Sequence, residues 1–162
     1  MSIGVRTATA ADADAIARLS ADVQAVHAAG LPELFKGPGV AALPATMVNA
    51  LLDIPSVRLL LAELDGIPAG YAYVEIRRRP EDGIRLRRDV VFVHQLSVQP
   101  AFQRHGVGRA LISAVRTLSE ELGVIAVELD VWRFNEPARR FFAQQGFVIF
   151  NERMWARLPQ PD

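Results

Sequence analysis

The stretch from Val90 to Leu122 reads VVFVHQLSVQPAFQRHGVGRALISAVRTLSEEL, and it decides the fold that we expect. It opens with an apolar run rich in β-branched residues, Val90–Val98, which predicts a strand. Pro100 interrupts this run, and a glycine-rich turn follows at Gln103–Gly108. Apolar residues at helical spacing then predict a helix: Val107, Ala110, Leu111, Ala114, Leu118 and Leu122. This order places free backbone N–H groups at a helix start, which suits an anion and most often a phosphate.

Length and composition limit the classes of protein to which the chain can belong. Its 162 residues predict a single domain spanning residues 1–162, and 51% of them are hydrophobic. The 18 Lys and Arg residues balance the 18 Asp and Glu residues, so the formal net charge is zero. A bulk electrostatic attraction to nucleic acid or to a membrane is therefore not expected.

The chain contains no cysteine. This excludes disulfides, thiolate nucleophiles and metal sites that use cysteine ligands. The first residues, MSIGVRTATAADADA, lack the basic-then-apolar order of a signal peptide. No apolar run approaches the roughly 18 residues that a membrane span needs. We therefore expect a cytoplasmic protein.

The front half of the chain predicts two helices and an antiparallel meander. Thr9 and Asp12 resemble a capping box, and apolar residues at three- and four-residue steps after them predict a helix that stops near Gly30. A loop at residues 31–43 and a short helix at residues 46–52 come next. The segments that predict strands are residues 3–8, 57–64, 67–79 and 90–98.

The back half predicts the order strand, helix, strand, helix, strand. After the strand at 90–98, the pattern predicts a helix from Gly106, a strand at 124–131, a helix at 136–145 and a last strand at 147–155. The first crossover should be right-handed and should place two strands side by side in parallel. We therefore predict an α/β fold with a mixed, mostly antiparallel sheet and helices on both faces.

Three interpretations compete for the glycine-rich turn Gln103–Gly108. In the first, the glycines only end a loop and start a helix. In the second, the turn is a dinucleotide fingerprint with Asp130 as the ribose-binding acid, but Leu111 occupies the third glycine position and a longer loop precedes the first glycine. In the third, the turn binds the pyrophosphate of coenzyme A, because Arg104 and Arg109 flank amides that glycine leaves accessible.

Two motifs then point to a family. VHQLSVQPAFQRHGVGRALISA resembles the central motif of the GNAT superfamily of acetyl-CoA-dependent N-acetyltransferases. VELDVWRFNEPARRFFAQQGF resembles the second motif of that family, including Asn135, Ala138 and the Gly146-Phe147 pair. The element order matches as well, so the resemblance covers nearly the whole chain. It implies a sheet that splays beside the fourth strand and direct attack of a primary amine on acetyl-CoA, which needs no cysteine.

The resemblance also implies which residues bind coenzyme A. The backbone that pairs with the pantetheine arm is Leu96, Ser97 and Val98. The residues at the pyrophosphate are Gln103, Arg104, His105, Gly106, Val107, Gly108 and Arg109. The residues along the pantetheine and adenine side are Asn135, Ala138, Arg139 and Phe142.

The acid and base positions match the family less well. The family often has a Tyr that protonates the leaving thiolate, four residues before the Gly-Phe pair, and here that position holds Phe142, which cannot donate a proton. Water and Tyr73 both stay open as the proton source. His94 and Glu75 are the candidate bases, and histidine is the residue type whose model-peptide pKa, about 6.5, lies nearest to neutral pH. The structural alternatives are a buried histidine within the sheet and a solvated strand glutamate.

The resemblance also implies which residues contact the acceptor amine. The loop after the first helix covers the acceptor cleft in the family, so His27, Glu33 and Phe35 are candidates, together with Tyr71. A capping or packing role for His27 is equally open. The acceptor itself, a small-molecule or peptide amine, is not identified by the sequence. The histidines lack metal-binding spacing, so no metal is expected.

A basic cluster brackets the turn that contains Pro80. Its members are Arg77, Arg78, Arg79, Arg85, Arg87 and Arg88. It is either a solvated hairpin or a surface for an anionic acceptor or a partner subunit. Nucleic acid is not expected as a partner, because no aromatic residues are interleaved with the arginines.

Glu128 and Asp130 share one face of their strand, which we expect to face water. Homodimers are common in the family. Because Phe142 stands where the acid is expected, a non-catalytic acyl-CoA sensor is the alternative function.

Overall fold

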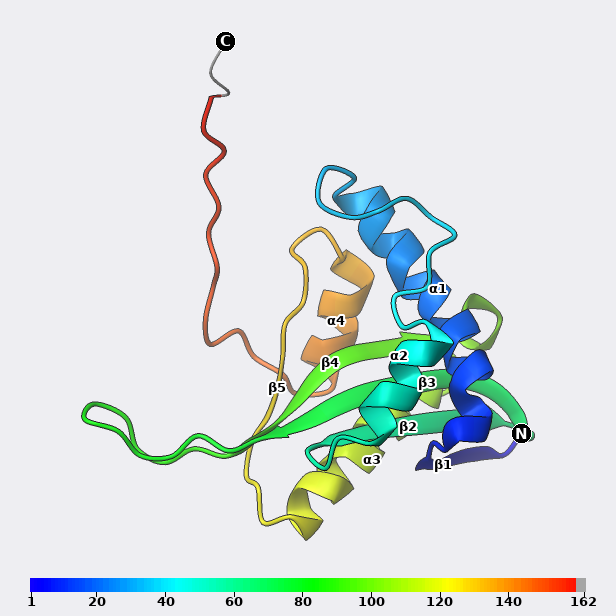
Figure 1. Ribbon diagram of the computed structural model, residues 1–162, viewed down its shortest axis with the longest axis horizontal. Coiled ribbons are helices and arrows are strands. Elements are labelled where there is room, and N and C mark those ends of the chain that lie inside the picture. The colour runs from blue at the N-terminus through cyan, green and yellow to red at the C-terminus, as the bar shows by residue number, and fades with distance from the viewer. Residues whose placement is uncertain (160–162) are drawn as a thin grey trace.

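The computed structural model describes residues 1–159, and its centre is a five-stranded sheet with the order β1-β2-β3-β4-β5 (Figure 1). The strands are β1 (Ile3–Thr7), β2 (Val57–Leu64), β3 (Ile67–Arg77), β4 (Val90–Val98) and β5 (Val127–Leu129). The helices are α1 (Ala13–Gly30), α2 (Ala45–Leu52), α3 (Val107–Glu121) and α4 (Glu136–Gln144), with single 3-10 turns η1 (Ala10–Asp12) and η2 (Pro100–Phe102).

The sheet has the mixed pairing that the sequence predicts. The first four strands form a meander in which each strand pairs antiparallel with the next. β5 returns through α3 and lies parallel to β4. The predicted α/β class and its parallel crossover are therefore confirmed, because an antiparallel hairpin series ends in one strand–helix–strand unit.

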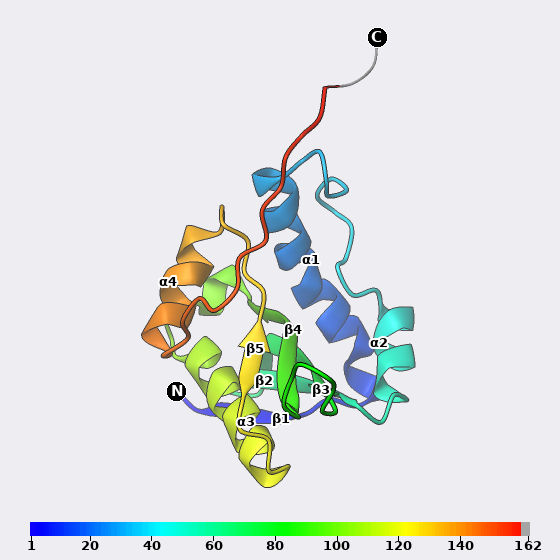
Figure 2. The same ribbon diagram turned by 90° about the vertical axis from the view of Figure 1, so that its left-hand side faces the viewer.

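Side-chain alternation along β2 sends its apolar residues to both faces of the sheet. Leu59 and Leu61 pack under α1 and α2, together with Ile16, whereas Leu60 and Ala62 face α3. Figure 2 shows α1 and α2 on one side of the sheet and α3 with α4 on the other. Both faces of the central strands are thus covered by helices, as predicted.

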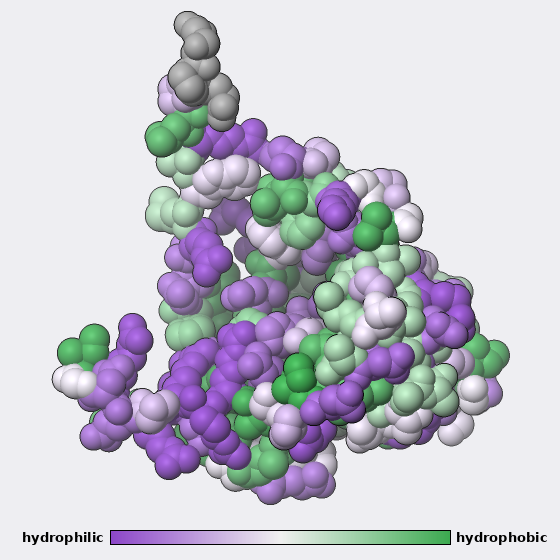
Figure 3. All heavy atoms as spheres, in the orientation of Figure 1, coloured by the Kyte–Doolittle hydropathy of each residue, from purple (hydrophilic) through white to green (hydrophobic). Residues whose placement is uncertain are grey.

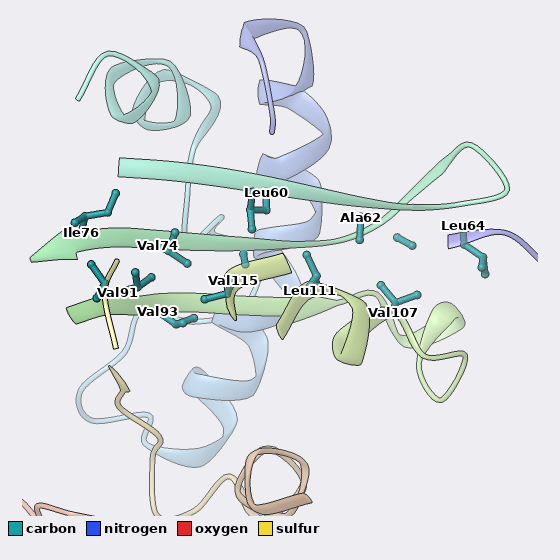
Figure 4. Close-up of a cluster of buried hydrophobic side chains, with 13 residues drawn as sticks. Leu60, Ala62, Leu64, Val74, Ile76, Val91, Val93, Val107, Leu111 and Val115 are labelled. Atoms are coloured by element: carbon teal, nitrogen blue, oxygen red, sulfur yellow. The ribbon is translucent and has the colours of Figure 1, made fainter. Parts of the chain in front are cut away.

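The core between the sheet and α3 is shown in Figure 4. Leu111 and Val115 of α3 are fully buried and lie against Val74 of β3 and Val93 of β4. Each buried side chain of this size contributes about 1.5–3 kcal/mol relative to its exposed state. This packing fixes the start of α3 beside the end of β4, where the glycine-rich turn lies.

The capping box at the start of the first helical segment is also confirmed. The Thr9 N–H donates to Asp12 Oδ2 at 2.8 Å. Arg6 of β1 reaches the same carboxylate with both terminal nitrogens at 2.8 Å, and it contacts Glu63 of β2 at 2.9 Å. The hydrogen bond from Arg6 lowers the pKa of Asp12 well below its usual range. This network joins β1, η1 and β2.

The predicted last strand at residues 147–155 is wrong, because the chain forms no strand there. Residues 147–158, which we call the tail, run away from the body of the molecule (Figure 1). The predicted strand at 124–131 is also shortened to the three residues of β5. The apolar pattern in the tail is that of a strand, but within residues 1–159 it finds no neighbouring strand to pair with.

The expectation that Glu128 faces water is wrong as well. Its side chain is only 9% exposed, and Arg79 and Arg88 approach its carboxylate at 3.2 and 2.5 Å. Both arginines come from residues 78–89, which we call the arm: an irregular extension that projects from the hairpin of β3 and β4 (Figure 1). In the same arm, Arg78 and Arg87 pair with Asp89 at 2.7 and 3.1 Å. Much of the basic cluster is therefore neutralised by carboxylates.

Candidate active site

β4 is paired on both edges only near its start. Along one edge it pairs with β3 from Val90 to Val98, whereas along the other it pairs with β5 only from Val91 to Val93. The backbone at residues 94–98 therefore has a free edge, and this edge leads into the glycine-rich turn. This geometry agrees with the splay beside the fourth strand that the family resemblance implies. A free strand edge can pair with an extended ligand through main-chain hydrogen bonds.

A β-bulge lies where the free edge begins. Tyr73 pairs with Gln95 and Val74 pairs with Val93, so His94 is an extra residue without a partner on β3. A bulge redirects side chains locally, and bulges are frequent next to active sites. The bulge explains why a polar histidine is accommodated inside an otherwise apolar strand.

His94 and Glu75 form a hydrogen-bonded pair on neighbouring strands. His94 Nε2 lies 2.7 Å from Glu75 Oε2, and the two side chains are 26% and 32% exposed. Arg77 Nε approaches the same oxygen at 3.1 Å. The hydrogen bond to His94 lowers the pKa of Glu75, and Arg77 adds to this effect against the opposing effect of burial. Sequence analysis treats the two residues as separate candidates, and the structure brings them together.

Tyr73 stacks directly on the His94 ring. The ring centroids are 4.4 Å apart with an interplanar angle of 16°, and Phe92 approaches the imidazole edge-on at 4.9 Å. Burial, and to a lesser degree Glu75, raises the pKa of Tyr73. The phenol is protonated at neutral pH, as the hydroxyl of an ordinary tyrosine is.

Tyr71 is placed differently from Tyr73. It is fully buried in the core under α1, and its hydroxyl donates to Gln95 Oε1 at 2.6 Å. Burial raises the pKa of Tyr71 strongly. The residue that sequence analysis missed here is Gln95, although a glutamine inside an apolar strand is itself a signal of a buried polar partner.

The glycine-rich turn presents a row of free amides. Gly106 has φ +91°, and Arg104 also has a left-handed φ of +64°. The backbone N–H groups of residues 104–109 donate no hydrogen bond within the described chain, because they precede or open α3. Arg104, His105 and Arg109 are exposed around them. Successive free amides in such a turn form an anion-binding concavity.

α4 packs close to the start of α3 through Phe141. A Cβ atom on Gly108 would lie 3.1 Å from the Phe141 ring, so a larger residue would separate the two helices. Asn135 caps α4, because its Oδ1 accepts the Ala138 N–H at 3.2 Å. Arg139 pairs with Glu136 within the same helix. The remaining predicted cofactor residue, Phe142, is half-buried between the rings of Phe141 and Phe147.

A family model covers the part of the chain that carries this geometry. The acetyltransferase (GNAT) family model matches residues 28–147. The chain belongs to the acetyltransferase (GNAT) family. The match includes the free edge of β4, the His94–Glu75 pair, the glycine-rich turn and α4. The match supports the coenzyme A interpretation of the turn over the dinucleotide interpretation.

Two proteins of similar sequence are named as N-acetyltransferases. The L-amino acid N-acetyltransferase AaaT of Escherichia coli is 29% identical over 100 residues, which make up 61% of this chain and 58% of that protein. An uncharacterized N-acetyltransferase of Archaeoglobus fulgidus is 32% identical over 87 residues, or 54% of this chain and 57% of that protein. The chain thus spans little more than half the length of these relatives.

Two solved structures share the GNAT fold of this chain. A tetramutant of the BH1408 protein of Bacillus halodurans matches 96% of this chain and 99% of that chain, with a TM-score of 0.91 and 24% identity. The aminoglycoside N-acetyltransferase AAC(6')-Iy, in complex with CoA, matches 97% of this chain and 95% of that chain, with a TM-score of 0.68 and 19% identity. At these identities the likeness establishes a common fold.

The GNAT chain also has a cluster of aromatic rings at the end of α1. His27 and Phe35 lie 4.7 Å apart, Phe35 meets Trp132 edge-on at 5.3 Å, and Trp132 stacks on Phe134 at 6.0 Å. We call these four residues the aromatic group. Burial lowers the pKa of His27, which favours its neutral form. Phe134 directly precedes Asn135, and Trp132 lies two residues before Phe134, so the aromatic group adjoins the start of α4.

The remaining predicted acceptor residue, Glu33, lies on the loop that follows α1. Its carboxylate contacts Arg157 of the tail. Within residues 1–159, no group of three or more histidine or acidic side chains is arranged to hold a metal ion. In the same range, no helix combines the length and the apolar character that crossing a membrane requires.

Proposed function

We propose that this protein transfers an acetyl group from acetyl-CoA to a primary amine. The observation that carries the proposal is the free edge of β4 at residues 94–98, which connects the His94–Glu75 pair at one end to the free amides of residues 104–109 at the other. An extended ligand with an anionic end and a reactive end fits this arrangement. Acetyl-CoA has this form, and the family fold supports the choice.

The residues at the turn fit the pyrophosphate of coenzyme A. The amides of residues 104–109 are free donors, Gly106 adopts a positive φ, and the cations of Arg104 and Arg109 lie in solvent beside them. The backbone of Leu96, Ser97 and Val98 would hold the pantetheine arm along the free edge. Asn135, Ala138 and Arg139 at the start of α4 would flank the cofactor on its other side. Bound acetyl-CoA supplies an activated acetyl group and a thiolate leaving group.

His94 is proposed as the base that deprotonates the acceptor ammonium. Its Nε2 faces Glu75, so Nε2–H donates to the carboxylate and Nδ1 carries the lone pair that accepts a proton. Glu75 remains ionised because its pKa is lowered, and its charge stabilises the imidazolium that forms. Arg77 orients the carboxylate by contacting the oxygen that faces His94. Proton removal by a positioned base typically contributes about 10²–10⁴-fold to the rate.

Tyr73 is proposed as the donor that returns a proton to the leaving thiolate. Phe142 cannot donate a proton, whereas Tyr73 carries a phenol hydroxyl that is protonated at neutral pH. Its ring lies flat on His94, so base and acid occupy one site. Water is the alternative donor, and the two are separated by the Tyr73→Phe experiment described in the Discussion.

The aromatic group is proposed as one wall of the acceptor site. Its rings are apolar, His27 favours the neutral form, and the carboxylate of nearby Glu33 is paired with Arg157. Such a wall favours an amine attached to an aromatic or aliphatic group. Of the acceptor types suggested by relatives, an L-amino acid therefore fits better than a polycationic aminoglycoside. Tyr71 is buried and its hydroxyl donates to Gln95 Oε1, so it would influence the acceptor only through Gln95.

The test is a CoA-release assay combined with binding measurements. Acetyl-CoA and NADH are titrated separately, and turnover is then measured with aromatic and aliphatic L-amino acids, a polyamine and an aminoglycoside. We expect acetyl-CoA binding and the highest kcat/KM with apolar amino acids. Tight acetyl-CoA binding without turnover on any amine would instead support the acyl-CoA sensor. Binding of NADH alone would contradict the proposed cofactor.

A further inference from the structure

The face of β3 that carries Tyr73 and Glu75 is only partly covered by helices. The even-numbered residues from 72 to 76 are buried on the α3 side, whereas Tyr73, Glu75 and Arg77 on the opposite side are each partly exposed. Arg77 is the last residue of β3, so it lies where the arm leaves the body of the molecule. Figure 3 shows hydrophilic residues gathered at this junction. A charged ligand can therefore reach this end of the site from solvent.

Two contacts hold the guanidinium group of Arg77 in place. Its Nε donates to Glu75 Oε2 at 3.1 Å, and its Cζ lies 3.7 Å from the centre of the Phe92 ring. Stacking on an aromatic ring fixes the plane of a guanidinium group and leaves its charge intact. Within residues 1–159, neither terminal nitrogen of Arg77 forms a hydrogen bond, and the side chain is 32% exposed. Both terminal nitrogens are therefore accessible to a ligand.

Arg77 differs in this respect from the paired arginines of the arm. The four arginines that pair with Asp89 or Glu128 each use a terminal nitrogen. Arg77 contacts Glu75 through Nε alone. A guanidinium group binds a carboxylate most strongly through two parallel N–H donors. Arg77 thus keeps the pair of terminal nitrogens that can bind an incoming carboxylate.

Arg77 also lies close to the proposed base. Arg77 Nε and His94 Nε2 approach the same oxygen of Glu75, at 3.1 and 2.7 Å. The His94 ring meets edge-on, at 4.9 Å, the same Phe92 ring on which Arg77 stacks. Burial and Glu75 raise the pKa of Tyr73 and the charge of Arg77 opposes them, so the guanidinium lies within electrostatic reach of the phenol. One small molecule can therefore contact His94 and Arg77 together.

The charges at this place suit a zwitterion. Glu75 is negative because its pKa is lowered, and Arg77 is positive at any ordinary pH. A simple amine arrives as a second cation beside Arg77, and like charges at short range repel. An α-amino acid carries a carboxylate one carbon away from its ammonium group. When that ammonium group approaches His94, the carboxylate comes within reach of Arg77.

We propose that Arg77 binds the carboxylate of the acceptor and thereby selects α-amino acids over amines that lack a carboxylate. The inference rests on the proposed acetyl transfer, and it gives Arg77 a role beyond its contact with Glu75. Polyamines and aminoglycosides bring only positive charge to this place, so Arg77 disfavours them. A neutral derivative of an amino acid loses the charge-assisted hydrogen bonds to the guanidinium group.

The first test compares amino acids with their carboxamides, which keep the amine and the side chain but carry no negative charge. CoA release is measured for L-phenylalanine against L-phenylalaninamide and for L-leucine against L-leucinamide. In Arg77→Met, we expect the ratio of kcat/KM for acid over carboxamide to fall at least about tenfold from its wild-type value. Methionine keeps an unbranched chain that packs on Phe92. Arg78→Met is the matched control, because Arg78 pairs with Asp89, and it should keep the wild-type ratio.

This ratio separates carboxylate binding from the contact between Arg77 and Glu75. Loss of the Glu75 contact lowers the rate with both members of a pair, whereas loss of carboxylate binding lowers the rate with the acid alone. The different basicity of the two amines cancels, because the same pair is compared in each variant. An acid-to-carboxamide ratio that is the same in Arg77→Met and the wild type would overturn the inference and leave acetyl transfer in place.

A second test measures binding without turnover. L-Phenylalanine is titrated by calorimetry into protein saturated with coenzyme A, which carries no acetyl group to transfer. We expect binding to the wild type and Arg78→Met, and at least about tenfold weaker binding to Arg77→Met. Absence of turnover on every amine would contradict the proposed function, and binding would then decide the role of Arg77 alone. Equal affinity of the wild type and Arg77→Met, or no binding to the wild type, would contradict carboxylate recognition.

Discussion

If His94 is the base, as we propose, its contact with Glu75 decides which imidazole nitrogen accepts the proton. In the proposed mechanism, Nε2 lies 2.7 Å from the carboxylate and donates to it, so Nδ1 is left as the proton-accepting atom. In Glu75→Gln, the neutral amide no longer stabilises the imidazolium, so kcat/KM should fall by at least about tenfold. The measurement is the pH profile of kcat/KM with the best acceptor from the panel.

Glu63→Gln serves as the control for this prediction. Glu63 also pairs with an arginine, Arg6, but it lies on β2 away from His94. Its replacement should leave kcat/KM unchanged. If Glu75→Gln retains wild-type activity across the pH range, Glu75 has no part in the reaction.

The stacking of Tyr73 on His94 allows its hydroxyl to be tested alone. Phenylalanine preserves the ring that packs on the imidazole at 4.4 Å and removes only the proton donor. If Tyr73 protonates the thiolate, Tyr73→Phe should lower kcat at least about tenfold with little change in KM. Single-turnover kinetics measure this step directly.

Phe142→Tyr is the matched change for the alternative proton source. It places a phenol where the family often has one. If water is the donor, this variant should keep or raise the rate, and Tyr73→Phe should cost nothing. An unchanged Tyr73→Phe rate would therefore remove Tyr73 from the mechanism.

At the scale of elements, the end of α1 controls how closely the aromatic group packs. A Cβ on Gly30 would lie 2.2 Å from the Phe134 ring, which is closer than atoms can approach. Gly30→Ala should therefore displace the segment between β5 and α4 and cost about 1–3 kcal/mol of unfolding free energy. We expect a lower Tm and a higher KM for the acceptor.

Gly37→Ala is the control within the same region. No atom lies within 4 Å of the position its Cβ would take. It should leave both Tm and KM near their wild-type values. Equal effects of the two substitutions would show that the Gly30 contact does not position the aromatic group.

The elements also show what local sequence can and cannot predict. The turn before α3 was predictable because glycine and helical spacing act over a few residues, and the meander was predictable from period-two patterns. The tail has the same strand pattern, yet it forms no strand because strand formation depends on a distant neighbour. The burial of Glu128 was missed for a similar reason, since its arginine partners lie about 40 to 50 residues earlier in the chain.

At the scale of the whole molecule, local sequence also predicts only part of the candidate active site. Period-two alternation placed Glu75 and Tyr73 on one face of β3, but the bulge that resets the register at His94 leaves no clear local signal. The pairing of His94 with Glu75 therefore became visible only when both strands were placed. The family resemblance supplied the expected cofactor residues and the acid–base candidates His94, Glu75 and Tyr73, whereas the geometry showed that these three side chains lie together.

The Arg6–Asp12–Glu63 network links distant parts of the fold, so it bears on global stability. The pKa of Asp12 is lowered in the folded state, so its stabilisation is fully present above the unfolded value of 3.8 and is lost as the pH falls toward the folded value. Wild-type unfolding free energy, measured by urea titration, should therefore begin to decrease below about pH 4 and should continue to fall toward about pH 2. Asp12→Asn should lose about 1–2 kcal/mol at pH 7 and show a flatter pH dependence. The control is Asp14→Asn at an exposed position, which should retain the wild-type dependence of unfolding free energy on pH. If Asp12→Asn and the wild type show the same dependence on pH, this account of acid sensitivity is refuted.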